Sequence, residues 1–355
     1  MTNWLCEQQD LFVAGNGGYH TYRIPALVIA ADGALLAICE GRRHGVGDAG
    51  EISLLLRRSV DAAHTWDPPR VIVEEAAMTC GNPCPVLDRV TGMIWLPFCK
   101  NRADGPEQAI NRGEAPRTVW LTHSADHGRT WAPPVEITAA VKRPDWTWYA
   151  TGPGHGIQLR SGRLIIPCDH RRGLHHNDSD PLHAHVVFSD NHGATWDIGG
   201  VVPAGTNECC VAETGAGEVY INCRDYRGTG VRSVAWSSNG GLTFGEHASD
   251  PALPEPVCQG SLAACDQPAT PQAQRILFAN PASARRECLT LRLSNDGCRT
   301  WPFARTLYPG PAAYSDLAVT ADGTVLCLYE RGDATPYERL TLARTSLAWL
   351  CEQSS

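Results

Sequence analysis

Hydrophobic residues along the chain fall into short runs, each about as long as one β-strand. Each run is mostly apolar, and clusters of Gly, Pro, Asn and Asp separate one run from the next. No segment has the 3.6-residue apolar spacing of a long amphipathic helix. The pattern therefore predicts an all-β protein, with strands that include the runs at 52–59, 119–124, 185–190, 233–238 and 289–294.

A short motif, Ser-x-Asp-x-Gly-x-Thr-Trp, follows each of these five runs. The motif suits a hairpin turn: Asp or Asn accepts hydrogen bonds from nearby backbone N–H groups, Gly adopts positive φ, and Thr-Trp resumes the strand with a ring that packs inside. Ala63 and Cys298 stand in place of the Gly, and Phe244 replaces the Trp. We interpret the motif as a structural device rather than an active site. Its copies begin at Ser59, Ser124, Ser189, Ser237 and Ser294.

A second repeated unit lies between these motifs and consists of two strand-like runs joined by a turn. Together with the run before the motif and a strand after it, this hairpin makes a unit of four antiparallel strands. Six units predict a six-bladed β-propeller that occupies residues 1–355 as a single domain, closed by a strand around Leu11–Val13. A β-sandwich is the alternative, but the repeat is too long for it. The predicted hairpins are Ala26–Glu40, Pro85–Phe98, Gly156–Cys168, Cys210–Arg224, Leu262–Asn280 and Asp316–Glu330.

Composition excludes several classes of function. The 38 Asp and Glu residues outnumber the 30 Lys and Arg residues, which gives a formal net charge of −8, and no Lys/Arg-rich run is present. This balance argues against a nucleic-acid partner and against a polybasic membrane patch. No run of 18 apolar residues is present either, so we expect no membrane span.

Cysteine and histidine residues indicate neither a disulfide framework nor a metal site. Fifteen cysteines are scattered along the chain, many in strand-like runs, which predicts buried thiols in a reducing compartment. The first fifteen residues lack the pattern of a signal peptide, so we expect a cytoplasmic location, or a secreted one if a leader has been removed. Neither Cys80 and Cys84 nor the five histidines between His170 and His185 have a common metal-site spacing, and we predict no metal and no cofactor.

The segment Tyr22–Pro25, Tyr-Arg-Ile-Pro, adds a feature that the turn motifs alone do not carry. Together with those motifs it resembles the exo-sialidases, or neuraminidases, in which an Arg-Ile-Pro signature precedes repeated motifs known as Asp boxes. The resemblance extends from about Tyr22 to Glu330. Asp boxes are weakly specific, because several propellers of other function contain them. Their combination with the signature and with the residues below, all in family order, is specific.

This resemblance implies three arginines that bind the carboxylate on the anomeric carbon of a sialoside. Arginine suits the task because its planar guanidinium donates two parallel hydrogen bonds, which lysine cannot do. Arg23 matches the first arginine by its Ile-Pro neighbours, and Arg224 matches the second. Arg286 best matches the third, although the adjacent Arg285 is an alternative.

The resemblance also implies a tyrosine nucleophile, which distinguishes sialidases from glycosidases that use two carboxylates. A carboxylate nucleophile would be repelled by the anionic substrate. Tyr314, in the sequence Tyr-Ser-Asp-Leu, matches the nucleophile, and Glu208 matches the carboxylate that accepts its proton. A phenol with a pKa near 10 needs such a base in contact to react near neutral pH.

By the same resemblance, Asp48 is the acid/base that protonates the leaving alcohol. It lies in a Gly-rich loop after the first hairpin, and Glu51 in the same loop is the competing candidate. Arg42 is expected to be a supporting cation near the acid or near the substrate carboxylate. Glu330 is expected to orient Arg23.

The leading hypothesis is therefore a glycoside hydrolase, a retaining exo-α-sialidase that releases terminal sialic acid through a sialyl-tyrosine intermediate. Its partner is then a sialylated glycan. Alternatives are a trans-sialidase, an enzyme for a related nonulosonic acid, and a non-catalytic Asp-box propeller that binds glycans or proteins.

Overall fold

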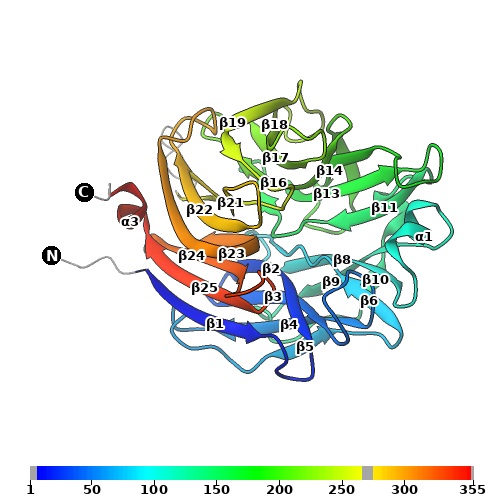
Figure 1. The fold of residues 1–355 in the computed structure, drawn as a ribbon, viewed down its shortest axis with the longest axis horizontal. Helices are drawn as coiled ribbons and strands as arrows, with labels where there is room; N and C mark the ends of the chain where they lie inside the picture. Colours follow the sequence, from blue (N-terminus) through cyan, green and yellow to red (C-terminus); the bar gives the residue numbers. More distant parts are fainter. Residues whose placement is uncertain (1–5, 266–274, 353–355) are drawn as a thin grey trace.

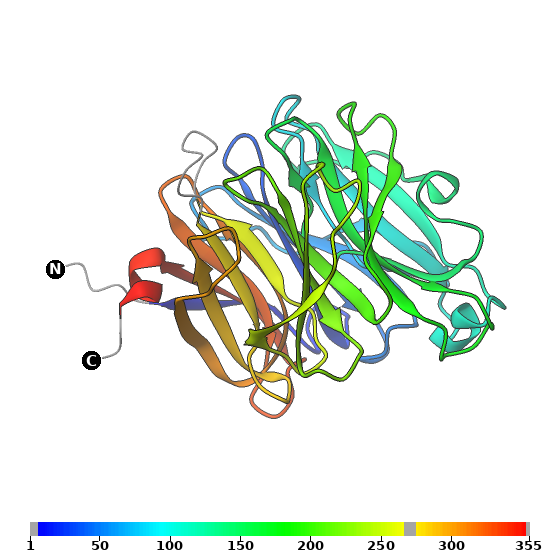
Figure 2. The same cartoon turned by 90° about the horizontal axis from the view of Figure 1, so that it is seen from above.

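Strands dominate the computed structural model, which describes residues 6–265 and 275–352. Figure 1 shows these strands grouped in sheets around a common centre, and Figure 2 shows the first and last elements of the chain at the same edge. Within the described residues the helices are short: α1 (Glu107–Asn111), α2 (Thr138–Val141) and α3 (Leu347–Cys351). The prediction of an all-β chain is confirmed.

Hydrogen bonds join the strands into four sheets. The first contains β2 (Thr21–Ile29), β3 (Leu35–Arg42), β4 (Ile52–Ser59), β5 (Arg70–Val73), β6 (Met78–Gly81), β7 (Val86–Leu87), β8 (Ile94–Arg102), β9 (Thr118–Ser124) and β10 (Val135–Glu136). The second contains β11 (Trp146–Thr151), β12 (Ile157–Gln158), β13 (Leu164–Arg172), β14 (Leu182–Ser189) and β15 (Asp197–Val201). The third contains β16 (Thr206–Glu213), β17 (Val219–Asp225), β18 (Val231–Ser237) and β19 (Ala248–Pro254). The fourth contains β1 (Glu7–Val13), β20 (Ser261–Ala264), β21 (Ile276–Pro281), β22 (Glu287–Ser294), β23 (Phe303–Val319), β24 (Thr324–Arg331) and β25 (Arg339–Ser346).

The first and fourth sheets have nine and seven strands, about twice the number in one predicted blade, and each has a single point at which two groups of strands join. In the fourth sheet, β23 pairs with β22 through its first half and with β24 through its second half. In the first sheet, β4 and β6 are joined through the one pair Ile52 and Thr79. The fold is therefore propeller-like with several sheets around a centre, and the count of six blades stays a prediction.

The predicted hairpins correspond to antiparallel strand pairs in the structure. These pairs are β2–β3, β7–β8, β12–β13, β16–β17, β20–β21 and β23–β24. The turn of the fifth hairpin lies outside the described residues. The N-terminal strand β1 pairs with β25, so the two ends of the chain meet in one sheet as expected.

The five turn motifs have the hydrogen bonds that their chemistry predicts. In each copy the Ser hydroxyl accepts a hydrogen bond from the backbone N–H of the fifth residue, at 2.8–3.1 Å. The Asp or Asn side chain accepts one from the N–H of the Thr, at 2.8–2.9 Å. The fifth residue has positive φ in every copy, including Ala63 and Cys298, each with φ of 66°.

Neighbouring sheets cover each other's faces, and this packing explains the continuously apolar strands. Every residue of β3 is buried, because β3 is flanked by β2 and β4 and its two faces pack in different clusters, one with β24 and β25 and the other with β8. Eleven of the fifteen cysteines are buried, in agreement with the prediction of buried thiols. Within the described part of the chain, no helix is long and apolar enough to cross a membrane.

Candidate active site

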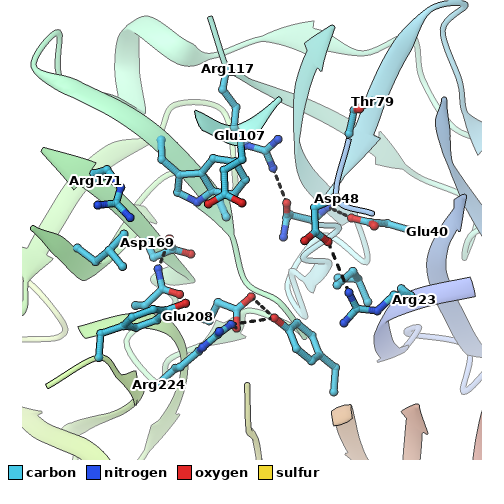
Figure 3. A pocket seen from close by; sticks show the side chains of 18 of the residues that line it. Arg23, Glu40, Asp48, Thr79, Glu107, Arg117, Asp169, Arg171, Glu208 and Arg224 are labelled. Atoms are coloured by element: carbon cyan, nitrogen blue, oxygen red, sulfur yellow. Dashed lines mark hydrogen bonds and ion pairs between the residues drawn. The ribbon is translucent and has the colours of Figure 1, made fainter. Parts of the chain in front are cut away.

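One pocket near the centre of the sheets collects most of the predicted site residues. Figure 3 shows Arg23 and Asp48 on one side of this pocket, Glu208 and Arg224 on the other, and Arg117 and Glu107 between them. Side chains from all four sheets line it, so its geometry depends on the closed arrangement of the sheets. Of the predicted residues, those that line the pocket are Arg23, Arg42, Asp48, Glu208, Arg224, Arg286 and Tyr314.

Local irregularities in three inner strands place these side chains. The pairing register shifts between Arg23 and Ala26 in β2, between Thr206 and Cys209 in β16, and between Ala312 and Ser315 in β23. A bulge of this kind bends a strand and re-aims the side chains within it. Arg23, Glu208 and Tyr314 lie at or within these irregularities, which is why they face the pocket instead of following the regular alternation of their strands.

The Arg-Ile-Pro signature forms the irregularity in β2. Ile24 has φ of 58°, a left-handed conformation that is rare for a β-branched residue and costs roughly 1–3 kcal/mol. Its N–H donates a hydrogen bond to the Glu330 carboxylate at 3.0 Å. Proline follows, and its ring restricts the conformation of the residue before it. The signature is therefore a strained bend that turns Arg23 towards the pocket.

Glu330 connects the first arginine to the backbone of the tyrosine. Its two carboxylate oxygens accept hydrogen bonds from Arg23 Nε at 3.0 Å and Nη2 at 3.2 Å. One of them also accepts the N–H of Tyr314 at 3.2 Å. Glu330 has no exposed surface and does not line the pocket, so it lies behind Arg23 and holds it in place.

Glu208, Arg224 and Tyr314 form a compact group. The Tyr314 hydroxyl donates a hydrogen bond to Glu208 at 2.5 Å, and Arg224 Nη1 contacts both Glu208, at 2.8 Å, and the Tyr314 hydroxyl oxygen, at 3.1 Å. Burial raises the pKa of Tyr314 well above its ordinary value, and the Glu208 charge raises it further, against the opposing effects of Arg224 and Arg23. The phenol is therefore protonated and donates to Glu208, the arrangement in which a base can remove its proton during reaction.

Asp48 lies at the pocket mouth, with a side chain that is 59% exposed. Its carboxylate contacts Arg42 at 2.8 Å and Arg23 at 3.5 Å. Partial burial raises the pKa of Asp48, but Arg42 and Arg23 outweigh that effect and hold it below its ordinary value. Arg42 is itself fixed by Glu40, at 2.7 Å. Glu51, the competing candidate, pairs with His44 at 3.3 Å and does not line this pocket.

The structure also separates the two candidates for the third arginine. Arg286 lines the pocket, and its guanidinium carbon lies 5.6 Å from the centre of the Tyr314 ring. The side chain of Arg285 is 81% exposed and pairs with Glu287 at 3.3 Å, outside the pocket. Arg23, Arg224 and Arg286 therefore face one space, whereas Arg285 does not.

Several pocket residues were missed by the sequence reasoning. Arg117 donates hydrogen bonds to the Tyr149 carbonyl at 2.6 Å and to Asn82, and its guanidinium lies 4.2 Å from the centre of the Trp148 ring. A charged residue at the start of an apolar strand was the available signal, but such residues are common at strand ends. The others that the sequence did not indicate include Glu40, Thr79, Asn82, Glu107, Asp169, Arg171, Asn207 and Tyr226.

Asp169 is a fully buried carboxylate at the side of the pocket opposite Asp48 (Figure 3). One of its oxygens accepts a hydrogen bond from Asn207 at 2.7 Å, and the other has no partner among the described residues. Burial raises the pKa of Asp169 well above its ordinary value, and the charge of nearby Glu208 adds to the effect. The raised pKa favours the protonated, neutral form of Asp169.

The histidines considered for a metal site lie apart from the pocket. His170 and His185 are buried, with their Nδ1 atoms 3.0 Å apart, and the His170 ring stacks on Trp146 at 3.5 Å between centres. Burial lowers the pKa of both, to about 3 for His185, so they are neutral packing residues. Within the described residues, no group of three or more His, Cys, Asp or Glu side chains is arranged to hold a metal ion.

Fold and pocket together define an Asp-box protein with a propeller-like arrangement of sheets, and comparison with known proteins agrees. The BNR repeat-like domain matches residues 33–327. A sialidase of Micromonospora viridifaciens is 35% identical over 98% of this chain and 54% of its own length. Sialidase-2 of Mus musculus is 33% identical over 89% of this chain and 90% of its own length. The chain therefore belongs to the sialidase family, and the prediction of a glycoside hydrolase is confirmed at the level of the family.

Solved structures give the same result for the fold. The Hadza microbial sialidase Hz136 has a TM-score of 0.86 and 30% identity, over 97% of this chain and 69% of its own length. A leech intramolecular trans-sialidase has a TM-score of 0.81 over 97% of this chain and 71% of its own, at 16% identity. The second likeness shows the fold alone.

Proposed function

We propose that this protein is a retaining exo-α-sialidase that hydrolyses terminal α-linked sialic acids through a sialyl-tyrosine intermediate. The single observation that carries this proposal is the 2.5 Å hydrogen bond from Tyr314 to Glu208 in a pocket that three arginines share. A pocket that only bound glycans would need the arginines but not a buried phenol with a base in contact. The membership in the sialidase family supports the same conclusion.

In the first step, Arg23, Arg224 and Arg286 bind the substrate carboxylate. Charge-assisted hydrogen bonds of this kind contribute about 1.5–3 kcal/mol each. The Tyr314 oxygen then bonds to the anomeric carbon as its proton passes to Glu208, and the bond from that carbon to the leaving oxygen breaks. Asp48 donates a proton to the leaving oxygen.

Asp48 must hold a proton for this step, although Arg42 and Arg23 keep its pKa low in the structure. A substrate carboxylate bound at Arg23 competes for the positive charge that stabilises ionised Asp48. Substrate binding therefore raises the pKa of Asp48 and favours its protonated form. In the second step, Asp48 removes a proton from water, water attacks the anomeric carbon, and Tyr314 leaves as its oxygen regains the proton from Glu208.

Mass spectrometry of the trapped intermediate tests this mechanism. A fluorinated sialosyl substrate slows the second step, so the sialyl group should remain on Tyr314 and appear in the peptide that contains it. Tyr314→Phe should show no label, and Glu208→Gln should label more slowly. A label on a carboxylate residue would contradict the proposed nucleophile.

A trans-sialidase is the second candidate, favoured by the leech enzyme's fold alone. Hydrolysis and transfer share the first step and differ in what attacks the intermediate. Product analysis with a sialoside in the presence and absence of lactose separates them, because transfer to lactose produces sialyllactose and intramolecular transfer produces an anhydro sugar. We propose hydrolysis and expect free sialic acid as the main product under both conditions.

For the fold, we propose six blades of four antiparallel strands. The division of β23 between two neighbours and the one-pair link of β4 to β6 support this count. Dividing the two large sheets there gives units of four or five strands, and with the other two sheets they make six units. An experimental structure that showed an extended ladder between β4 and β6 would contradict it.

A further inference from the structure

Tyr337 lies behind the carboxylate-binding arginines, in the connection between β24 and β25. Its ring packs against a small cluster of buried residues made of Ile24, Cys258, Ala313 and Tyr314. A lone tyrosine in a polar connection resembles a surface residue, so nothing in the sequence around Tyr337 indicates a role. In the structure it is half-buried beside the nucleophile and close to two of the three arginines.

Tyr337 contacts these two arginines with different parts of its side chain. The Arg23 guanidinium carbon lies 4.4 Å from the centre of the ring, within cation–π distance. The hydroxyl oxygen accepts a hydrogen bond from Arg286 Nη1 at 2.8 Å. One residue therefore fixes the relative positions of Arg23 and Arg286.

Arg286 differs from the other two arginines because its hydrogen-bond partners in the described part of the chain are neutral groups, which leave its positive charge uncompensated. Arg23 pairs with Glu330, and Arg224 pairs with Glu208. Within residues 6–265 and 275–352, Arg286 donates hydrogen bonds to neutral oxygens: the Tyr337 hydroxyl, at 2.8 Å, and the Val257 carbonyl, at 3.3 Å. A phenol orients a guanidinium without neutralising it, so the charge of Arg286 stays available to an anion.

The connection that presents Tyr337 is internally braced. The Glu338 carboxylate accepts hydrogen bonds from three successive backbone N–H groups, at 2.8–3.0 Å. These bonds lower the pKa of Glu338 to about 2. The Tyr308 hydroxyl donates to the Gly332 carbonyl at 2.7 Å at the start of the same connection. Tyr337 is thus held in place before any ligand arrives, which reduces the entropy lost on binding.

We propose that Tyr337 is a positioning residue that aligns Arg23 and Arg286 on the carboxylate of the sugar acid and, being neutral, keeps the Arg286 charge for that carboxylate. This inference rests on the proposed function, because it assigns the anion as the substrate's carboxylate. In this proposal Tyr337 does not contact the substrate itself but sets the positions of Arg23 and Arg286, which bind the substrate carboxylate.

The variant Tyr337→Phe tests the proposal, because it removes the hydroxyl and leaves the ring against Arg23. Binding of an unsaturated sialic acid inhibitor and of its methyl ester is measured by calorimetry. We expect affinity for the acid to fall about tenfold, the scale of one hydrogen bond to a charged group, with little change for the ester. With a fluorogenic sialoside, KM should rise and kcat should change little. Equal losses for acid and ester, or no loss, would overturn the proposal.

Two controls separate positioning from a general effect on the connection. Tyr308→Phe removes a hydroxyl that braces the same connection without contact to the pocket arginines, and it should leave the acid-to-ester ratio unchanged. In an Arg286→Met background, Tyr337→Phe should have little further effect, because the hydroxyl acts through Arg286. A full additional loss in that background would contradict the proposed route.

Failure of this inference is distinguishable from failure of the proposed function. If the wild-type protein neither binds the acid inhibitor nor cleaves the sialoside, the proposed function is wrong. If the wild type does both and Tyr337→Phe matches it, only the role of Tyr337 is wrong.

Discussion

Asp48 illustrates how the role of a single residue depends on the charges around it. Its carboxylate contacts Arg42 at 2.8 Å and Arg23 at 3.5 Å, so the two arginines favour the ionised form. The proposed acid role requires the protonated form. The contribution of Asp48 to the rate should therefore depend on how strongly the leaving group requires a proton, and this requirement differs between substrates.

Replacing Asp48 by Asn should therefore affect substrates unequally. Natural sialosides leave as poorly acidic sugar alkoxides, and kcat/KM for sialyllactose should fall by about 10²–10⁴-fold. A sialoside of methylumbelliferone leaves as a stable phenolate, and its kcat/KM should fall much less. The substitution also removes the base of the second step. Because kcat/KM reports only the steps up to formation of the intermediate, this second effect does not disturb the comparison between the two substrates. Equal losses on both substrates would instead mean that Asp48 positions the loop or the sugar.

At the scale of elements, the turn motifs show how one backbone shape accepts different residues. The fifth position has positive φ in all five copies, yet two copies have a side chain there. What differs is the neighbouring sheet. A Cβ added to Gly193 would lie 2.2 Å from the Trp95 ring, whereas Ala63 is already accommodated in the core.

Gly193→Ala should therefore be strongly destabilising. The substitution combines left-handed strain of about 1–2 kcal/mol with overpacking of about 1–3 kcal/mol, because the half-buried Trp95 ring is held by a hydrogen bond to the His192 carbonyl at 3.0 Å. Gly33→Ala is the matched control: its φ of 82° is similar to the 88° of Gly193, but a Cβ there meets nothing within 4 Å. Urea unfolding should show a loss for Gly33→Ala that reflects strain alone. Equal losses at the two positions would mean that the clash with Trp95 is relieved by rearrangement.

At the scale of the whole molecule, a partly buried ion pair joins three sheets. Asp316 in β23 accepts a hydrogen bond from His155, which lies between β11 and β12, at 2.8 Å, and one from the N–H of Leu27 in β2 at 2.7 Å. Burial lowers the pKa of His155, but the Asp316 charge outweighs that effect and raises the pKa above its ordinary value of 6.5.

This pair should make stability depend on pH. A raised folded-state pKa means that the contribution of the charged pair is fully present below about pH 6.5 and is lost as pH rises through the folded-state pKa. The free energy of unfolding lost in His155→Asn should therefore be larger at pH 5.5 than at pH 8.5, by about 1–3 kcal/mol. His175→Asn, at an exposed position, is the control and should show no such difference. A loss that is equal at both pH values would mean that His155 contributes packing alone.

Local sequence patterns were sufficient to predict the strands, the turn motifs and the hairpins, because each depends on residues close together in the chain. They also singled out Arg23, Arg224 and Tyr314, since each stands in a short motif that matches the sialidase family. These predictions could be made because short apolar runs, turn chemistry and short motifs are local properties.

The folded structure was needed to show that Asp48 lines the pocket and Glu51 does not. It was needed in the same way to distinguish Arg286, which lines the pocket, from Arg285, which does not. Each pair lies in one loop or at adjacent positions, and the direction of a side chain there depends on how distant strands pack. Arg117, Asp169 and Tyr337 could not be found from the sequence for a related reason. The residues that surround them come from segments far apart in the chain. These side chains therefore become buried and meet their charged neighbours only when the sheets have closed around the pocket.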